Sequence, residues 1–290
     1  MGIFYGLLTA LAWGGSDFIA RFATRRFGAI RTMLYMQGFG FCFLSIFLLR
    51  THQWGHLFDG SGWQPWGWGL LAGCVNTFSS LTLYRSFEIG KLSLVAPLSA
   101  SSPALTVALS VLSGERLTRI HAAGIFATML GVLLVAHAEE PPDPADAEAV
   151  RRSGKGIALA LMAAAGFGVL FWLLGIRTVP RTGAIAAVWL IRMVGFSATL
   201  AILLLAKLPV GVQVGKATLQ LVGMGMMDTT AFVTNNKGFQ VEQISIVSVL
   251  ASLYGAITVA LAAIFLREKV ARWQWAGIAA IFTGIYLISK

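Results

Sequence analysis

Apolar residues run along most of this chain in stretches about as long as a membrane is thick, each bounded by charged residues, glycine or proline. A helix needs roughly 20 predominantly apolar residues to cross the hydrocarbon core of a bilayer. The pattern therefore predicts an all-α, polytopic membrane protein with ten transmembrane helices. We place these helices near residues 2–22, 28–49, 66–86, 92–113, 119–137, 156–176, 182–206, 217–238, 243–266 and 271–289.

One stretch breaks this pattern. Residues 138–155 include the sequence EEPPDPADAEAVRRSGK, which is rich in proline, carries five acidic residues and has no apolar periodicity. We expect a solvated linker there, between a first five-helix repeat at 1–137 and a second at 156–290.

Composition supports the membrane interpretation. Of the 290 residues 57% are hydrophobic and 12% charged, whereas soluble domains have about 25% charged residues. The net charge of +10 comes from Lys and Arg scattered at helix ends, which is typical of a protein whose partner is the lipid bilayer and not nucleic acid. Cys42 and Cys74 lie in apolar stretches, where we expect buried thiols and neither a disulfide nor a metal site.

The two halves of the chain repeat each other. Gly28-Ala29 aligns with Gly183-Ala184, and FEIGKLSLVAPL (87–98) aligns with FQVEQISIVSVL (239–250). GERLTRIHAAGIFATMLGVLLV (114–135) aligns with REKVARWQWAGIAAIFTGIYLI (267–288). Because each half has an odd number of helices, the second must enter the membrane from the opposite side. Inverted repeats are typical of transporters that work by alternating access.

The closing segments pair several residues of the two halves: Glu115 with Glu268, Gly124 with Gly277, and Gly131 with Gly284. We expect the two glutamates, which follow the fourth and ninth helices, to tie loops together and to have no catalytic role.

The five-plus-five layout and the repeated GERLTRIHAAG and REKVARWQWAG segments resemble the EamA-type branch of the drug/metabolite transporter superfamily, over essentially the whole chain. The resemblance implies a monomer with a central cavity between the halves. The chain is similar to bacterial exporters of aromatic and other neutral amino acids, and the superfamily also includes carriers of sugars, nucleotide sugars, choline and drugs. The amino acid exporters have an aromatic residue before the proline of the fourth helix, where this chain has Ser102 before Pro103. This departure counts against an aromatic substrate.

Three ionisable residues fall inside the predicted helices, where each is costly and therefore a candidate for function. Arg192 and Asp228 lie near the middle of the seventh and eighth helices, and Asp17 lies toward the end of the first. One hypothesis is that Arg192 binds a substrate carboxylate while Asp228 binds an amine or a coupling proton; the alternative is that the two simply neutralise each other. Asp17 precedes Arg21 by four residues, so an interfacial ion pair is expected there.

The repeat places further polar residues beside these. Arg192 aligns with Gln37 and Asp228 with Asn76, which predicts a polar seam shared by both halves. Small polar side chains follow helix faces near this seam, either lining a wet path or letting helices pack closely. The candidate substrate-binding residues are Trp13, Gln37, Asn76, Ser80, Ser99, Ser102, Trp172, Arg192, Asp228 and Tyr254.

Pro97 and Pro103 remove backbone donors from the fourth helix and should kink it, which makes them candidates for gating, although a merely tolerated kink is equally compatible.

Orientation is predicted differently by two criteria. Of the 22 Lys and Arg residues, 14 lie in the loops opposite the chain termini, which favours termini outside the cytoplasm. The resemblance implies cytoplasmic termini, and we adopt it because an inverted repeat carries similar charge on both faces. A C-terminal reporter active only in the periplasm would contradict this choice.

The sequence thus predicts a multi-pass inner-membrane secondary transporter of small metabolites, with amino acid export as the leading hypothesis. Carriers of cationic drugs or choline-like compounds, or of sugars, are the alternatives. No nucleotide-binding loop, metal-ligand spacing or nucleophile elbow is present in the sequence, so we expect no cofactor, no enzymatic activity, and energy from a gradient.

Overall fold

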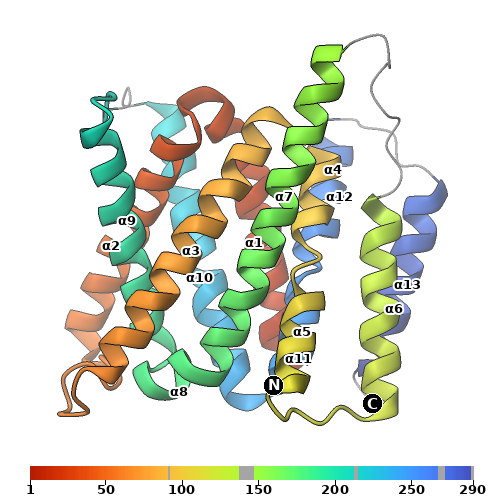
Figure 1. Cartoon of the computed structure of the whole chain (residues 1–290), viewed down its shortest axis with the longest axis horizontal. Coiled ribbons are helices and arrows are strands. Elements are labelled where there is room, and N and C mark those ends of the chain that lie inside the picture. Colours follow the sequence, from red (N-terminus) through yellow and green to blue (C-terminus); the bar gives the residue numbers. More distant parts are fainter. Residues whose placement is uncertain (91, 137–146, 212–214, 267–271, 289–290) are drawn as a thin grey trace.

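A computed structural model describes residues 1–90, 92–136, 147–211, 215–266 and 272–288. All regular structure in these ranges is helical, and the helices stand side by side with both chain ends at the same face (Figure 1). The elements are α1 Gly2–Phe27, α2 Ala29–Thr51, α3 Gln64–Ile89, α4 Leu92–Ser99, α5 Pro103–Leu112, α6 Arg119–Ala136, α7 Ala147–Leu173, the π-helix η1 Leu174–Thr178, α8 Val179–Thr182, α9 Ala184–Leu205, α10 Lys216–Val241, α11 Ile244–Ala251, α12 Tyr254–Leu266 and α13 Arg272–Ile288.

These elements confirm the ten predicted crossings, because α4 with α5 forms the fourth, α7 with η1 and α8 the sixth, and α11 with α12 the ninth. Five described stretches are long and apolar enough to cross a membrane by themselves: Gly2–Phe27, Ala29–Thr51, Arg151–Thr182, Ala184–Leu205 and Ile244–Phe265. α3 and α10 are 26 residues long, but polar side chains along their buried faces make them less apolar. α7 begins at Ala147, within the expected linker, and residues 137–146 lie outside the described part.

Large apolar side chains cover the flanks of the bundle. Ile46 and Leu49 on α2 are each 63% exposed, as is expected of residues that contact lipid. Cys42 and Cys74 are exposed as well, so the expectation of buried thiols was wrong. Each cysteine lies on the outward face of its helix. Apolar neighbours in the sequence are found both in helix faces that contact lipid and in faces that contact protein, so they do not show which face a cysteine is on.

The packing follows an inverted two-fold repeat. α1 packs along α10, and its counterpart α7 packs along α3; α2 crosses α9, and α6 crosses α13 (Figure 1). Gly28 and Gly183, which the repeat aligns, both have left-handed φ values, 82° and 94°, and each forms the tight turn between two helices.

The α6–α13 contact displays the symmetry most directly. A Cβ on Gly124 would lie 2.8 Å from the carbonyl oxygen of Gly284, and a Cβ on Gly131 would lie 2.6 Å from that of Gly277. Because Gly124 aligns with Gly277 and Gly131 with Gly284, the two contacts exchange when the halves are exchanged. Small residues let these backbones approach closely, as in other membrane helix pairs.

The fourth and ninth crossings are both broken. α4 ends at Ser99 and α5 begins at Pro103, while α11 ends at Ala251 and α12 begins at Tyr254. The fourth crossing, for which the prolines predict a kink, is thus interrupted, with Pro103 at the first position of α5, where a proline needs no donor. Pro97 lies within α4. Since the ninth crossing breaks without a proline, the break is a property of the repeat.

Glu115 links the halves at the face that carries the chain ends. Its carboxylate accepts a hydrogen bond from the Ser245 backbone N–H in the first turn of α11, at 3.2 Å, where the helix dipole favours an anion. Burial raises the pKa of Glu115, and the hydrogen bonds from Ser245 act against that rise. Its repeat counterpart Glu268 lies outside the described residues.

Candidate functional site

A buried ion pair lies inside the bundle. Arg192 on α9 is 0% exposed, and its Nη2 lies 2.7 Å from Oδ2 of Asp228 on α10. Arg192 Nη1 donates to Oε1 of Gln37 on α2 at 2.8 Å. The aligned residues Gln37 and Arg192 thus contact each other, which places them where the two-fold axis of the repeat passes.

The surroundings of Arg192 enclose it completely. Its guanidinium carbon lies 4.9 Å from the ring centre of Phe232, a cation–π arrangement. A Cβ on Gly40 would lie 3.0 Å from Arg192 Cδ, so the glycine gives the side chain its room. Arg192 is therefore occupied by Asp228, Gln37 and Phe232, and a substrate carboxylate would have to displace Asp228 to reach it.

A small cavity adjoins the Asp228 side of this pair. It has a volume of about 30 Å³, which is room for one or two water molecules. Its wall comes from five elements: Trp13 and Asp17 of α1, Ser80, Leu83 and Tyr84 of α3, Phe167 and Phe171 of α7, Asp228 and Phe232 of α10, and Tyr254 of α12. A cavity of this volume is too small for a choline-sized or amino acid-sized solute unless its wall moves.

Asp17 lies in this wall, deeper than the interfacial position we expected. Its exposure is 5%, and no hydrogen bond or ion pair joins it to another residue in the described part of the chain. Asp228, in contrast, pairs with Arg192 and accepts a hydrogen bond from Trp13 Nε1 at 3.1 Å. The cavity therefore holds two carboxylates, of which one is compensated.

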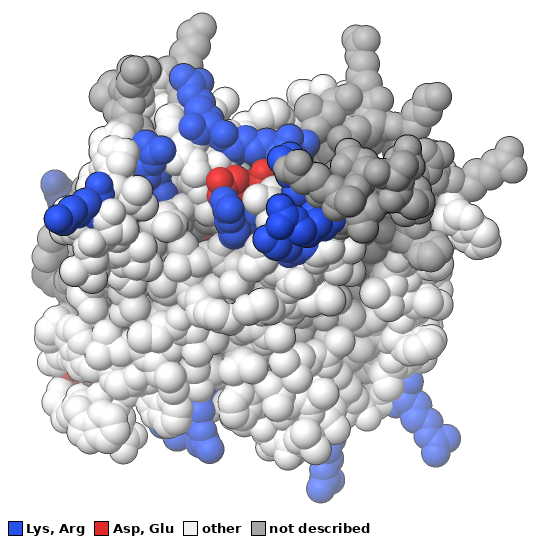
Figure 2. Space-filling view, turned by 45° about the horizontal axis from the view of Figure 1, so that its top comes forward, with Lys and Arg blue, Asp and Glu red and all other residues white. Residues whose placement is uncertain are grey.

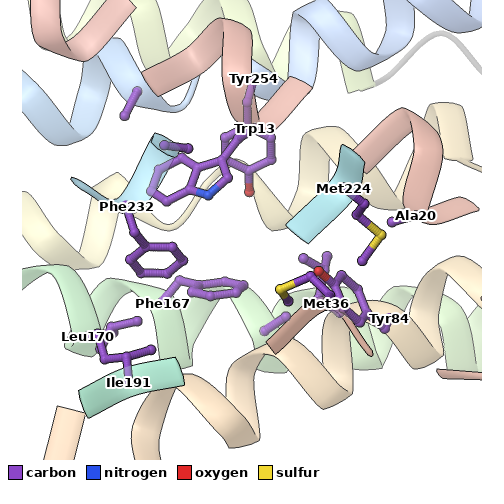
Figure 3. Close-up of a cluster of buried hydrophobic side chains, with 14 of the residues drawn as sticks. Trp13, Ala20, Met36, Tyr84, Phe167, Leu170, Ile191, Met224, Phe232 and Tyr254 are labelled. Atoms are coloured by element: carbon purple, nitrogen blue, oxygen red, sulfur yellow. The ribbon is translucent and has the colours of Figure 1, made fainter. Parts of the chain in front are cut away.

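Aromatic rings form the rest of the wall. The Trp13 ring centre lies 5.1 Å from that of Phe232, 5.3 Å from Phe171 and 5.9 Å from Tyr254. Figure 3 shows Trp13, Phe232, Phe167 and Tyr254 converging from different helices. Faces of aromatic rings attract cations, and beside carboxylates they favour an ammonium group over an anion.

The helix breaks also contribute to the site. Tyr254, the first residue of α12, donates its hydroxyl hydrogen to Ser99 Oγ at the end of α4, at 3.3 Å. Ser102, in the break between α4 and α5, is 2% exposed, and its hydroxyl has no partner among the described residues. The two broken crossings thus meet beside the cavity.

Two buried amides continue the polar interior toward the face that carries the chain ends. Asn76 lies one turn before Ser80 on α3, and Asn235 lies one turn after Phe232 on α10. Both are at most 1% exposed, and neither amide has a hydrogen-bond partner in the described structure. A buried amide without hydrogen-bond partners is unfavourable, so Asn76 and Asn235 are suited to hydrogen-bond water or a solute when the helices separate.

With this geometry established, comparison with known proteins is informative. The model of the EamA-like transporter family matches residues 1–137 and again residues 154–290. The chain belongs to the EamA-like transporter family. As a member of this family it is a multi-pass membrane protein that transports small solutes.

The other comparisons concern the fold. A solved structure described only as "Crystal structure of protein" is similar over 99% of this chain and 95% of its own, with a TM-score of 0.77 and 18% identity. No curated protein matches the chain. The similarity supports the same architecture and does not indicate a substrate.

Within this EamA-like protein the predicted site residues separate into four groups. Trp13, Ser80, Asp228 and Tyr254 line the cavity, while Gln37, Ser99 and Arg192 lie directly behind it. Asn76 and Ser102 are buried without lining it. Trp172 points elsewhere: its Nε1 donates to Ser113 Oγ at 2.8 Å.

Sequence reasoning missed several cavity residues. The sequence predicts an interfacial position for Asp17 and does not by itself select Tyr84, Phe167, Phe171 or Phe232, all of which line the cavity. Phe171 is the immediate neighbour of Trp172, about 100° away around the helix. The i, i+4 spacing of Phe167 and Phe171 was an available signal that one aromatic face of the sixth crossing points inward.

Proposed function

We propose that this protein is a secondary transporter of small organic cations, such as amines and choline-like compounds, across the inner membrane by alternating access. The observation that carries the proposal is the cavity in which uncompensated Asp17 lies among aromatic rings, with Asp228 opposite. A carboxylate beside aromatic faces is the chemistry that recognises an ammonium group.

Amino acid export is the competing function, because an amino acid also carries an ammonium group. Its carboxylate would need a cationic partner, and Arg192, which suggested this class from the sequence, is already paired with Asp228 at 2.7 Å. Breaking that pair would leave two carboxylates, Asp17 and Asp228, to share the single ammonium group of the substrate. The geometry therefore favours a substrate without a carboxylate.

Asp17 also provides a means of coupling to a proton gradient. An ionised carboxylate at this depth needs a compensating cation, and either a proton or the substrate ammonium group supplies it. Because the proton and the substrate compete for one carboxylate, the site binds only one of them at a time. This competition supports exchange, in which the solute crosses in one direction and the proton in the other.

The volume of about 30 Å³ implies that rings must move for a solute to enter. The breaks before α5 and α12 are the positions at which the helices can bend, since the i→i−4 hydrogen bonding of an α-helix is interrupted there and partly replaced by i→i−3 bonds. Opening toward the face with the chain ends would bring Asn76 and Asn235 into contact with water.

Efflux of labelled choline from proteoliposomes under an imposed pH gradient tests the proposal. We expect Asp17→Asn to abolish gradient-driven flux while Asp59→Asn, the same substitution in an exposed loop, leaves it unchanged. Flux should be inhibited by quaternary amines and not by neutral amino acids. Inhibition by amino acids alone, with flux of a labelled amino acid in place of choline, would assign the competing function.

A further inference from the structure

A second and larger cavity, of about 480 Å³, opens at the opposite end of the bundle from the chain termini. It lies where α1 turns into α2, against the last turns of α3 and α9. Its apolar wall includes Phe27, Leu81, Leu159, Leu203, Leu208 and Pro209. The volume is in the range of ligand sites, and the apolar wall fits hydrocarbon.

Two arginines and one glutamate stand at this cavity. Arg85 and Glu88 on α3 form an ion pair at 2.7 Å, and Glu88 also accepts the Ala29 backbone N–H at 3.3 Å. Glu88 therefore neutralises Arg85. Arg31 on α2 also lines the cavity, and no hydrogen bond or ion pair joins it to another residue that the structure describes. The cavity consequently carries one uncompensated positive charge.

The wider face has the same sign. Figure 2 shows Lys and Arg side chains gathered on this side, with a few acidic side chains among them. A guanidinium binds phosphate through paired N–H donors, and basic pockets between helices at a membrane surface bind anionic lipid headgroups.

We propose that this cavity is a binding site for an anionic phospholipid, whose phosphate pairs with Arg31 while an acyl chain occupies the apolar wall. The site is distinct from the central cavity: Leu81, Thr82 and Arg85 line it, whereas Ser80, Leu83 and Tyr84 of the same helix line the central one. Because α2 also holds Gln37 against Arg192, a lipid at its first turn stabilises the arrangement of α2 and α9.

Native mass spectrometry and thermal unfolding of the full-length protein, titrated with phosphatidylglycerol or phosphatidylcholine, test the site. We expect phosphatidylglycerol to be retained and to raise the unfolding temperature of the wild type, with phosphatidylcholine having much less effect. Arg31→Gln should weaken phosphatidylglycerol binding about tenfold, as expected for one charge-assisted hydrogen bond. Arg31→Lys should retain part of the binding.

Arg151→Gln is the matched control, because Arg151 is exposed at the start of α7 on the same face and does not line the cavity. Equal phosphatidylglycerol binding by Arg31→Gln and Arg151→Gln would overturn the proposal, as would equal binding of both lipids to the wild type. Stabilisation by inorganic phosphate alone that depends on Arg31 would show an anion site and overturn the lipid assignment.

Discussion

Asp228→Asn should destabilise this protein far more than an ordinary carboxylate substitution. Arg192 is 0% exposed, and Asp228 is the carboxylate that pairs with it. Removing one partner of a buried pair leaves an uncompensated charge and costs about 3–5 kcal/mol. For chains of roughly 150–250 residues each kcal/mol lowers the unfolding temperature by about 2–4 °C, so the expected loss is about 6–20 °C. Gln37 keeps its hydrogen bond to Arg192, which favours the lower half of that range.

A double-mutant cycle isolates this effect. Arg192→Gln combined with Asp228→Asn removes both charges of the pair and should recover most of the stability that Asp228→Asn loses, because Arg192 no longer leaves a buried charge without its partner. The measurement is thermal unfolding in detergent, followed by the fluorescence of the nine tryptophans. If the double variant is as unstable as Asp228→Asn, the pair does not have the compensating role that the structure gives it.

Two further predictions follow from contacts around the site and between the halves. Gly195→Ala should lower transport and cost about 1–3 kcal/mol of stability, because the new Cβ would lie 2.6 Å from Gln37 Nε2 and push that amide away from Arg192. Gly211→Ala is the control: its Cβ would point into open space, so it should change neither transport nor unfolding temperature. Stability should fall as pH rises from the ordinary glutamate pKa through the raised pKa of Glu115, because the folded state binds the proton more tightly than the unfolded state does. Glu115→Gln, which can still accept the Ser245 N–H, should flatten this part of the profile of unfolding temperature against pH. An unchanged profile would contradict the assignment.

The sequence predicted the crossings and the repeat because both depend on patterns within the chain. Apolar length determines whether a helix can span a bilayer, and the aligned glycines and polar residues recur at a constant spacing. The alignment of Gln37 with Arg192 predicted a polar seam shared by both halves, and in the structure the two side chains touch, as aligned residues do when they lie on the axis of a two-fold repeat.

The cavity wall was predicted less completely for a physical reason. Periodicity shows which residues share a helix face but not how far each helix is rotated about its axis, and a rotation of about 100° exchanges Phe171 for Trp172. The sequence misplaces Asp17 because its spacing from Arg21 fits a local pair, and only the packing of α1 against α3, α10 and α12 shows its burial. Composition likewise could not show that Arg192 is enclosed.

Proton release on cation binding tests the central claim most directly. Purified protein in weakly buffered detergent solution is mixed with choline, and the pH change and bound choline are measured together. Asp59→Asn is the control, because hydrogen bonds from Ser61 and His56 hold the pKa of Asp59 at about 2. The Asp59 carboxylate therefore stays ionised at any pH well above that value and neither binds nor releases a proton in the experiment. We predict that the wild type and Asp59→Asn bind choline and release protons, whereas Asp17→Asn does neither. Equal choline binding by Asp17→Asn, or binding by the wild type without proton release, would contradict the account.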